Sequence, residues 1–203
     1  MPRVALVTSS KYPDLTQDDR LLLRPLAERG IQAEAAIWDD PEIDWTIFDA
    51  VVLRSCWDYH LKYEVFLRWI GLLEQGRIPV WNSAALVRWN ANKSYLRDLE
   101  AKGIPIVPTF WPEAGDPVRL RERLYELAWE KAVVKPRVSA TAHRTHLIAA
   151  DEADSVQELF DELRNGPGAM VQKFMDGIVK EGEWSVIFLG GQYSHAVLKR
   201  AKA

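Results

Sequence analysis

Four short apolar runs in about the first 85 residues constrain the fold more than any other feature of the sequence. They occupy residues 4–7, 31–37, 48–53 and 78–82, and amphipathic helical patterns lie between the first and second runs and between the third and fourth. The first of them, residues 4–7, is continuous, which is typical of a strand buried on both faces of a parallel sheet. The alternation of the runs with helices predicts an α/β fold with a doubly wound parallel sheet and right-handed crossovers.

The first expected helix opens at Asp18, Asp19 and Arg20 and runs to Ala27, with Gly30 just beyond it. Carboxylates suit a helix N-terminus, so we interpret Asp18 and Asp19 as capping residues rather than as ligand contacts. The second expected helix covers residues 63–73, with apolar side chains on one face. No G-x-G-x-x-G follows the first run, so the dinucleotide-binding fingerprint is missing.

Ligands of such sheets bind beyond the carboxyl ends of the strands, and residues 54–60 follow the third run directly. A guanidinium, a hydroxyl, aromatic rings and a carboxylate gather there, which suits a small amino-acid-like substrate. The candidate substrate-binding residues are Arg54, Ser55, Trp57, Asp58 and Tyr59. In the alternative interpretation Trp57 and Tyr59 only cover the end of the sheet, and Asp58 caps the next helix.

The second half of the chain has a different pattern, which predicts α+β structure with antiparallel strands. Expected strands cover residues 132–136, 145–149, 169–174 and 183–189, with helices at 118–129 and 155–163 between them. Gly190 and Gly191 form the two-residue turn of a hairpin that returns through residues 193–199. Residues 176–182 are expected to be a flexible acidic connection.

Lys135 stands at the end of an apolar strand, and Pro136 and a run of small and hydroxyl residues follow it. Such a loop leaves backbone N–H groups free to face an anion, with the lysine charge beside them. The stretch is therefore either a phosphate-binding loop or a buried strand followed by a polar turn. It is not a Walker loop, because no G-x-x-x-x-G-K-[ST] is present.

Composition excludes several classes of function. A formal net charge of −3 over 203 residues argues against general nucleic-acid binding. No apolar run approaches the roughly 20 residues that span a bilayer, and no signal peptide is expected, so no membrane partner is predicted. The single Cys56 fits a reducing cytosol and a packing role, and thus a cytoplasmic protein. The four histidines show no ligand spacing typical of zinc.

Five ordered motifs of the second half resemble the ATP-grasp ligase superfamily. They lie at residues 92–96, 103–109, 133–136, 171–174 and 183–186. The first half is similar to the pre-ATP-grasp domain that precedes this fold. Further motifs, at residues 18–20, 38–41, 54–59, 87–90 and 195–200, resemble a narrower subfamily that includes the cyclo-ligase closing O-ureidoserine in the cycloserine pathway. The resemblance implies a pre-ATP-grasp domain over residues 1–88 and an incomplete ATP-grasp region over residues 89–203. The ATP-grasp region is divided into residues 89–131, 132–173 and 174–203.

The resemblance also implies roles for individual residues. Lys93 and Lys135 would contact nucleotide phosphates, and residues 139–143, including Ser139, Ala140 and Thr141, would form a flap over the β- and γ-phosphates. The adenine would lie against Gln172, Lys173 and Phe174, and Glu183 would accept hydrogen bonds from the ribose. Lys199 and Arg200 would be catalytic, facing the transferring phosphate, because phosphoryl transfer depends on positioning and charge neutralisation.

The function that these roles imply is ATP-dependent joining of a carboxylate to an amine through an acyl phosphate. The alternative is a non-catalytic nucleotide-binding remnant of the fold. ATP and Mg²⁺ are the implied cofactors, and the metal ligands are expected beyond residue 203, since the chain resembles a C-terminally truncated ligase. An exposed apolar face along Val186, Phe188 and Val197 is expected, and a homodimer is a possible way to cover it. The sequence leaves open the substrate and the choice between cyclisation and intermolecular ligation.

Overall fold

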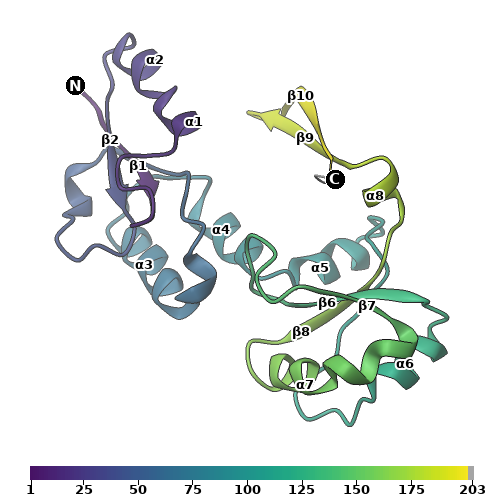
Figure 1. Ribbon diagram of the computed structural model, residues 1–203. Coiled ribbons are helices and arrows are strands. Elements are labelled where there is room, and N and C mark those ends of the chain that lie inside the picture. Colours follow the sequence, from purple (N-terminus) through teal and green to yellow (C-terminus); the bar gives the residue numbers. More distant parts are fainter. Residues whose placement is uncertain (201–203) are drawn as a thin grey trace. The chain divides into compact units, whose positions relative to one another are not determined.

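The computed structural model describes residues 1–200 and divides the chain into two compact units. The first unit comprises Met1–Ile104 together with Arg137–Arg144, and the second comprises Pro105–Pro136 together with residues 145–200. Figure 1 labels their helices and strands. The predicted domain boundary at residues 88/89 stays a prediction. Within residues 1–200, no helix combines the length and the apolar character needed to cross a membrane.

The first unit is built on a parallel four-stranded sheet, as the apolar runs predict. Its strands are β1 (Arg3–Thr8), β2 (Gln32–Ile37), β3 (Ala50–Leu53) and β4 (Val80–Trp81), in the order β2-β1-β3-β4. Val4 pairs with Ala33 on one side and with Ala50 on the other, so β1 is central. Its residues Ala5, Leu6 and Val7 are at most 1% exposed, which explains the unbroken apolar run.

Helices and aromatic side chains complete the core of this unit. α3 (Tyr63–Gln75) buries Phe66, Trp69, Ile70 and Leu73, which recur at the spacing of one helix face. Trp38, at the end of β2, is 1% exposed and meets Phe66 edge to face at 5.4 Å. The remaining elements are α4 (Ala84–Ala91), α5 (Tyr95–Ala101), η1 (Trp45–Ile47) and η2 (Tyr59–Leu61).

The helix expected from Asp18 to Ala27 is in fact two short helices, α1 (Gln17–Arg20) and α2 (Leu23–Ala27). The break has a local cause. Pro25 has no N–H to donate to the carbonyl of Leu21, and its ring crowds that carbonyl, so the hydrogen-bond ladder cannot run from one helix into the next.

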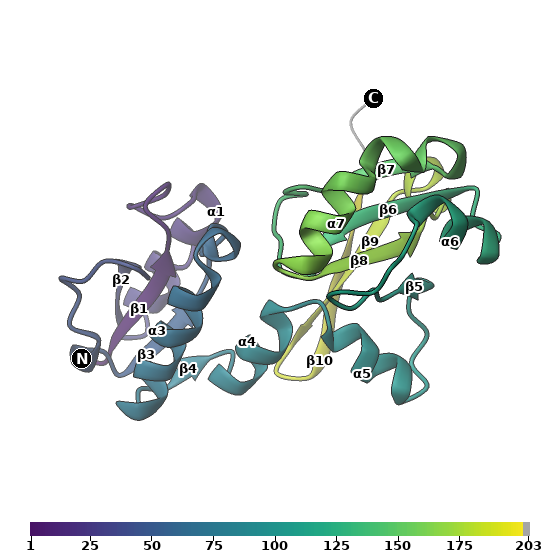
Figure 2. The same ribbon diagram turned by 90° about the horizontal axis from the view of Figure 1, so that it is seen from below.

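The second unit contains an antiparallel four-stranded sheet, as predicted. Its strands are β5 (Thr109–Phe110), β6 (Lys131–Pro136), β7 (His146–Ala149) and β8 (Ala169–Lys173), in the order β5-β8-β6-β7. α6 (Leu120–Glu126), η3 (Ala150–Val156) and α7 (Gln157–Asn165) pack on one face of the sheet (Figure 2). Leu120, Phe160 and Leu163 from these helices are fully buried against Val134 and Val171 from the strands.

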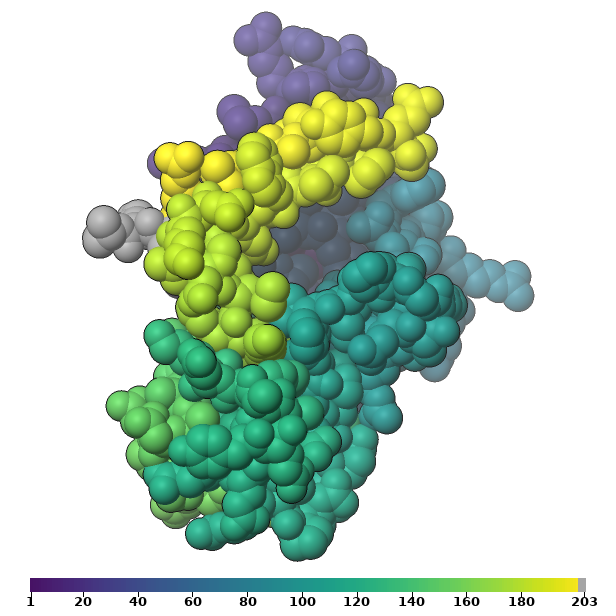
Figure 3. All heavy atoms as spheres, turned by 90° about the vertical axis from the view of Figure 1, so that its right-hand side faces the viewer, coloured from purple at the N-terminus to yellow at the C-terminus, as the bar shows by residue number. Residues whose placement is uncertain are grey.

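A two-stranded hairpin, β9 (Glu183–Leu189) and β10 (Gln192–Lys199), follows. Its turn is the predicted one, with Gly190 and Gly191 at φ values of +59° and +80°. The hairpin lies at the surface (Figure 3), and the side chains expected to form an exposed apolar face do so: Val186 is 52% exposed, Phe188 60% and Val197 45%. The prediction of a flexible connection before it is wrong, because α8 (Gly177–Lys180) occupies that stretch.

Candidate functional site

The carboxyl ends of β1 and β3 form a topological switch point in the first unit. β1 is followed by β2 on one side of it, and β3 lies on the other side, so the connections leave the sheet in opposite directions there. Ligands of open α/β sheets bind at such a crevice. The backbone N–H groups of Arg54 and Ser55 both donate to the carbonyl oxygen of Val7, at 3.1 and 3.0 Å. These bonds fix the start of the predicted substrate-binding stretch to the end of β1.

Asp19 lies at the centre of this crevice. Arg54 Nε donates to its Oδ1 at 2.7 Å, and Ser55 Oγ donates to its Oδ2. Asp19 is 3% exposed and Ser55 1%, whereas 40% of the Arg54 side chain is exposed. The interpretation of Asp19 as a capping residue is therefore wrong. Thr16 caps α1 instead, by accepting from the Asp19 N–H at 3.1 Å.

The surroundings of the Asp19 carboxylate keep it charged. Burial acts to raise its pKa, but the hydrogen bonds from Ser55 and Arg54 outweigh burial and hold the pKa below its ordinary value. The site thus contains a carboxylate that is ionised, almost completely buried and paired with an arginine whose outer part reaches solvent.

A pocket of about 680 Å³ opens over this group. Arg54, Ser55 and Trp57 of the predicted substrate residues line it. Tyr12 and Trp57 form one wall, with their rings edge to face at 5.4 Å. Asp19 also lines the pocket, and sequence reasoning did not select it as a site residue, because its partners stand 35 and 36 positions away.

Asp58 and Tyr59 face different neighbours. Asp58 Oδ1 accepts a hydrogen bond from Trp38 Nε1 at 2.9 Å, and its side chain caps no helix, so the capping alternative is wrong. Tyr59 packs against the core, and its hydroxyl lies 3.4 Å from the carbonyl oxygen of Ala91. Cys56 lies in the same stretch and is 8% exposed. Burial raises the pKa of its thiol to about 12, which agrees with a packing role.

Lys93 and the predicted flap also lie in the first unit. Lys93 Nζ donates to the carbonyl oxygen of Ser139 at 2.5 Å and to its hydroxyl at 3.2 Å, so the lysine holds the start of the loop. Ser139 is buried, whereas Ala140 is half-buried and Thr141 exposed. Thr141 has a φ of +51°, a conformation that a β-branched residue rarely adopts, so part of the loop is strained.

In the second unit, Lys135 and Gln172 share the face of the sheet opposite the helices. Side chains alternate along β6, so Ala132 and Val134 face the helical core while Val133 and Lys135 face the other way. Gln172 lies directly opposite Val133 in the register and therefore shares the face with Lys135. The structure thus brings these two predicted nucleotide-binding side chains together.

The Gln172 side chain is held in place and 9% exposed. Its Nε2 donates to Thr109 Oγ1 at 3.0 Å, and that hydroxyl donates to the carbonyl oxygen of Val107 at 2.7 Å. Among residues 1–200 the amide oxygen of Gln172 has no donor, so this oxygen and the second Nε2 hydrogen remain for a ligand. The N–H groups of Lys173 and Phe174 already donate to the carbonyls of Pro108 and Lys131, at 2.9 and 3.0 Å, so a bound base would use other main-chain atoms of this strand.

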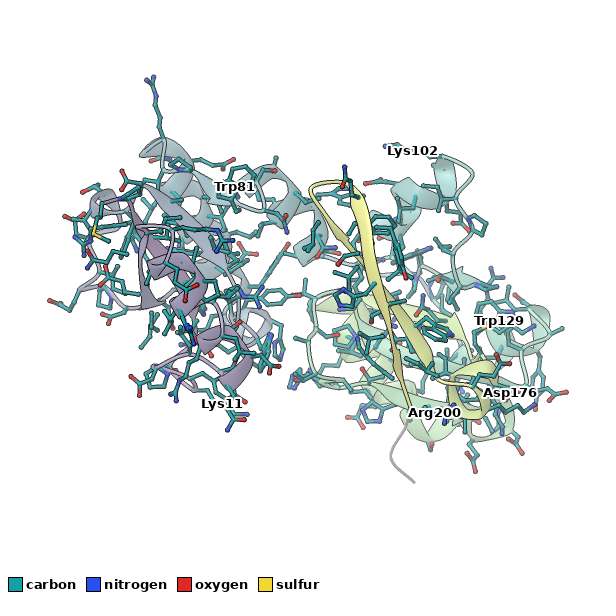
Figure 4. The ribbon with its side chains drawn as sticks, turned by 90° about the horizontal axis from the view of Figure 1, so that it is seen from above. Lys11, Trp81, Lys102, Trp129, Asp176 and Arg200 are labelled. Carbon is teal, nitrogen blue, oxygen red and sulfur yellow. The ribbon has the colours of Figure 1, made fainter. Side chains whose placement is uncertain are left out.

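Lys135 is half-buried, and Glu183 attracts it. Burial lowers the pKa of the Lys135 ammonium, and the Glu183 carboxylate partly offsets the effect. Within residues 1–200, the Lys135 ammonium has no hydrogen-bond acceptor. Glu183 also stands opposite Lys199 in the register of the hairpin. Arg200 follows at the end of the hairpin away from its turn (Figure 4).

A metal centre is not formed by the residues that the structure describes. Over residues 1–200, no group of three or more histidine, cysteine, aspartate or glutamate side chains is placed to hold an ion.

Comparison with solved structures defines the class of protein. The fold matches an ATP-grasp RimK domain protein from Sphaerobacter thermophilus with a TM-score of 0.65 and 23% identity, over 85% of this chain and 64% of that one. It matches D-alanine–D-alanine ligase from Bacillus anthracis in complex with ATP with a TM-score of 0.55 and 14% identity, over 86% and 60%. The fold is that of the ATP-grasp ligases.

Relatives of higher identity show the family to which the chain belongs. Residues 4–82 match the family described as D-cycloserine synthetase DcsG, N-terminal domain. The chain is 31% identical to the cycloserine biosynthesis protein DcsG of Streptomyces lavendulae, over 98% of this chain and 67% of DcsG. The crystal structure of D-cycloserine synthetase DcsG superposes with a TM-score of 0.90 and 28% identity, over 98% and 68%. The chain therefore belongs to the family of ATP-grasp ligases that includes DcsG, enzymes that form C–N bonds.

Proposed function

We propose that this protein is an ATP-dependent carboxylate–amine ligase that acts through an acyl phosphate on an amino-acid-like substrate. One observation carries the proposal. Lys135 is a half-buried ammonium without a hydrogen-bond acceptor among residues 1–200, on the same sheet face as a buried amide with a free oxygen. A desolvated cation is unfavourable unless it meets an anion, so this face is prepared for a negatively charged ligand.

ATP fits this face of the second unit. Lys135 would contact its α- and β-phosphates, and the Gln172 oxygen would accept a hydrogen bond from an adenine amino group, with Lys173 and Phe174 beside the base. Glu183 would accept from the ribose hydroxyls, and its charge partly offsets the effect of burial on the pKa of Lys135. Lys199 and Arg200 would neutralise the charge of the transferring phosphoryl group.

The phosphate contacts of the first unit rest on the family resemblance. Lys93 would reach a phosphate, and Ser139, Ala140 and Thr141 would cover it as a flap. The contacts of the free protein are compatible with this role, because the ammonium of Lys93 is bound to a main-chain carbonyl of the flap that a phosphate oxygen can replace.

The chemistry needs two further partners. The substrate carboxylate would take the γ-phosphoryl group, and a nitrogen would then attack the acyl carbon and displace phosphate. Bound magnesium would supply charge neutralisation at the phosphates, and no residue of the described chain is assigned to it. The pocket lined by Arg54, Ser55 and Trp57 is the proposed substrate site.

The test is release of phosphate from ATP and Mg²⁺, measured over a panel of amino acids and their O-substituted and ureido derivatives. The ligase proposal predicts release that requires one acid and yields a new amide. ATP binding without acid-dependent release over the whole panel contradicts it and supports a non-catalytic nucleotide-binding protein. Mass spectrometry of the product distinguishes cyclisation from joining of two molecules.

A further inference from the structure

The Asp19–Arg54–Ser55 group lies where an open α/β sheet binds its ligand. The hydrogen bonds within the group indicate which of its side chains is available to that ligand. The group joins Asp19 of α1 to Arg54 and Ser55 of the loop after β3, and the bonds from Arg54 and Ser55 to Val7 hold that loop at the end of β1. Its buried carboxylate receives two side-chain donors, so it has little capacity left for a ligand of its own. The guanidinium of Arg54, in contrast, uses only its Nε–H in the group and keeps its other N–H groups for a ligand.

We infer that Asp19 is a positioning residue that aims Arg54 at the carboxylate of a zwitterionic amino-acid substrate. This inference deepens the proposed function and rests on it. Arg54 donates through Nε to Asp19, and its two terminal nitrogens carry the remaining four N–H groups of the guanidinium. Arg54 lines the 680 Å³ pocket with 40% of its side chain exposed, so those groups are accessible to a ligand.

A structural ion pair alone explains the group less well. A pair that includes a partly exposed arginine adds little stability, whereas burial of the carboxylate is unfavourable. The bond from Arg54 Nε to Asp19, whose other carboxylate oxygen is held by Ser55, restricts rotation of the guanidinium. A fork that is already oriented loses less entropy when a planar carboxylate binds to it with two parallel hydrogen bonds.

The charges around the pocket select the class of ligand. The pocket is lined by two carboxylates, Asp18 and Asp19, and by two guanidiniums, Arg20 and Arg54. Their sum is zero, which disfavours a phosphate dianion and suits a molecule that carries one negative and one positive charge. The Tyr12–Trp57 wall offers an apolar surface for its side chain.

The experiment compares D-alanine with D-alaninamide, which has the same amine but no carboxylate. Ligand-observed NMR titration gives both dissociation constants, with and without a non-hydrolysable ATP analogue. The wild-type protein is expected to bind D-alanine at least about tenfold more tightly, as a charge-assisted hydrogen-bond pair allows. Arg54→Lys and Asp19→Asn should bring the ratio close to one, and Asp14→Asn, which changes an exposed carboxylate in the loop before α1, should leave it unchanged.

Controls separate positioning from folding. The far-UV circular dichroism and the affinity for the ATP analogue should change little in Asp19→Asn, which shows that the variant is folded at the temperature of the titration. If that variant does not fold, Ser55→Ala, which removes one of the two donors to Asp19, should lower the ratio by an intermediate factor. Equal binding of both compounds by the wild type in both conditions, or an unchanged ratio in a folded Asp19→Asn or Ser55→Ala, overturns the inference. The titration measures binding and needs no turnover. A negative ligase assay would therefore contradict the proposed function without changing the outcome of the titration.

Discussion

Replacement of Lys135 by methionine should stabilise the free protein and at the same time weaken nucleotide binding. Methionine keeps most of the length and apolar volume of the lysine stem but removes the half-buried charge. Burial lowers the pKa of Lys135 below its ordinary 10.5. Between the folded and unfolded pKa values the unfolded state binds more protons, so the stability of the wild type rises with pH in that window. Lys135→Met should lack this rise and melt at a higher temperature near pH 7.

The loss of ATP affinity follows from the same environment. A hydrogen bond between charged groups is worth about 1.5–3 kcal/mol, which corresponds to roughly a 10- to 150-fold change in the dissociation constant. The Lys135 ammonium is already partly desolvated in the free protein, so a phosphate meets little further desolvation of the lysine. We therefore expect a loss toward the upper end, about 100-fold.

Calorimetric titration with ATP, and melting without ligand, measure the two effects. Lys180→Met removes an exposed lysine of the same unit and should change neither. The wild type should also bind ATP less tightly as pH rises through the lowered pKa, with uptake of a proton on binding. A less stable Lys135→Met protein with unchanged ATP affinity would refute the reasoning, because the lysine would then be a structural residue.

Three further predictions concern single residues. Asp19→Asn should remove the part of the stability that is present above the unfolded pKa of 3.8 and is lost as pH falls through the lowered folded pKa, which acid titration followed by circular dichroism detects. Gly182→Ala should destabilise the protein by about 1–3 kcal/mol in urea, because φ is +106° and a Cβ would lie 2.6 Å from the carbonyl oxygen of Lys199; a loss below about 0.5 kcal/mol contradicts this. Cys56, with a pKa of about 12, should react with a thiol reagent at pH 8 only on unfolding, and rapid labelling of native protein contradicts its burial.

Local patterns were sufficient to predict most strands. The apolar runs within β1 and β3 are continuous, as is typical of the inner strands of a parallel sheet, whereas the edge strand β2 includes Gln32 and Glu34. The Gly190–Gly191 pair allows one tight turn. Both signals depend on neighbours in the sequence. The helix break at Leu21 was also readable in principle, since Pro25 stands four positions later.

The candidate site was less accessible to sequence reasoning. An aspartate in the first turn of a helix is typically a capping residue, and nothing near Asp19 indicates that its partners are Arg54 and Ser55. Asp58 was misread in the same way, since its partner Trp38 lies 20 positions away. Contacts of this kind depend on strand order, which brings the ends of β1, β2 and β3 together and which no local pattern specifies.

Gln172 shows the opposite case. A glutamine in an apolar strand needs hydrogen-bond partners, and this need alone marks the position as unusual. The structure supplies one partner, Thr109, and leaves the amide oxygen available on the face that carries Lys135.

A crystal structure of the protein with a bound non-hydrolysable ATP analogue tests the central claim most directly. The account predicts adenine density against Gln172 on β8, the ribose hydroxyls at Glu183 and a phosphate at Lys135. Density for the analogue away from these three side chains, or against the sheet face covered by α6 and α7, would contradict it.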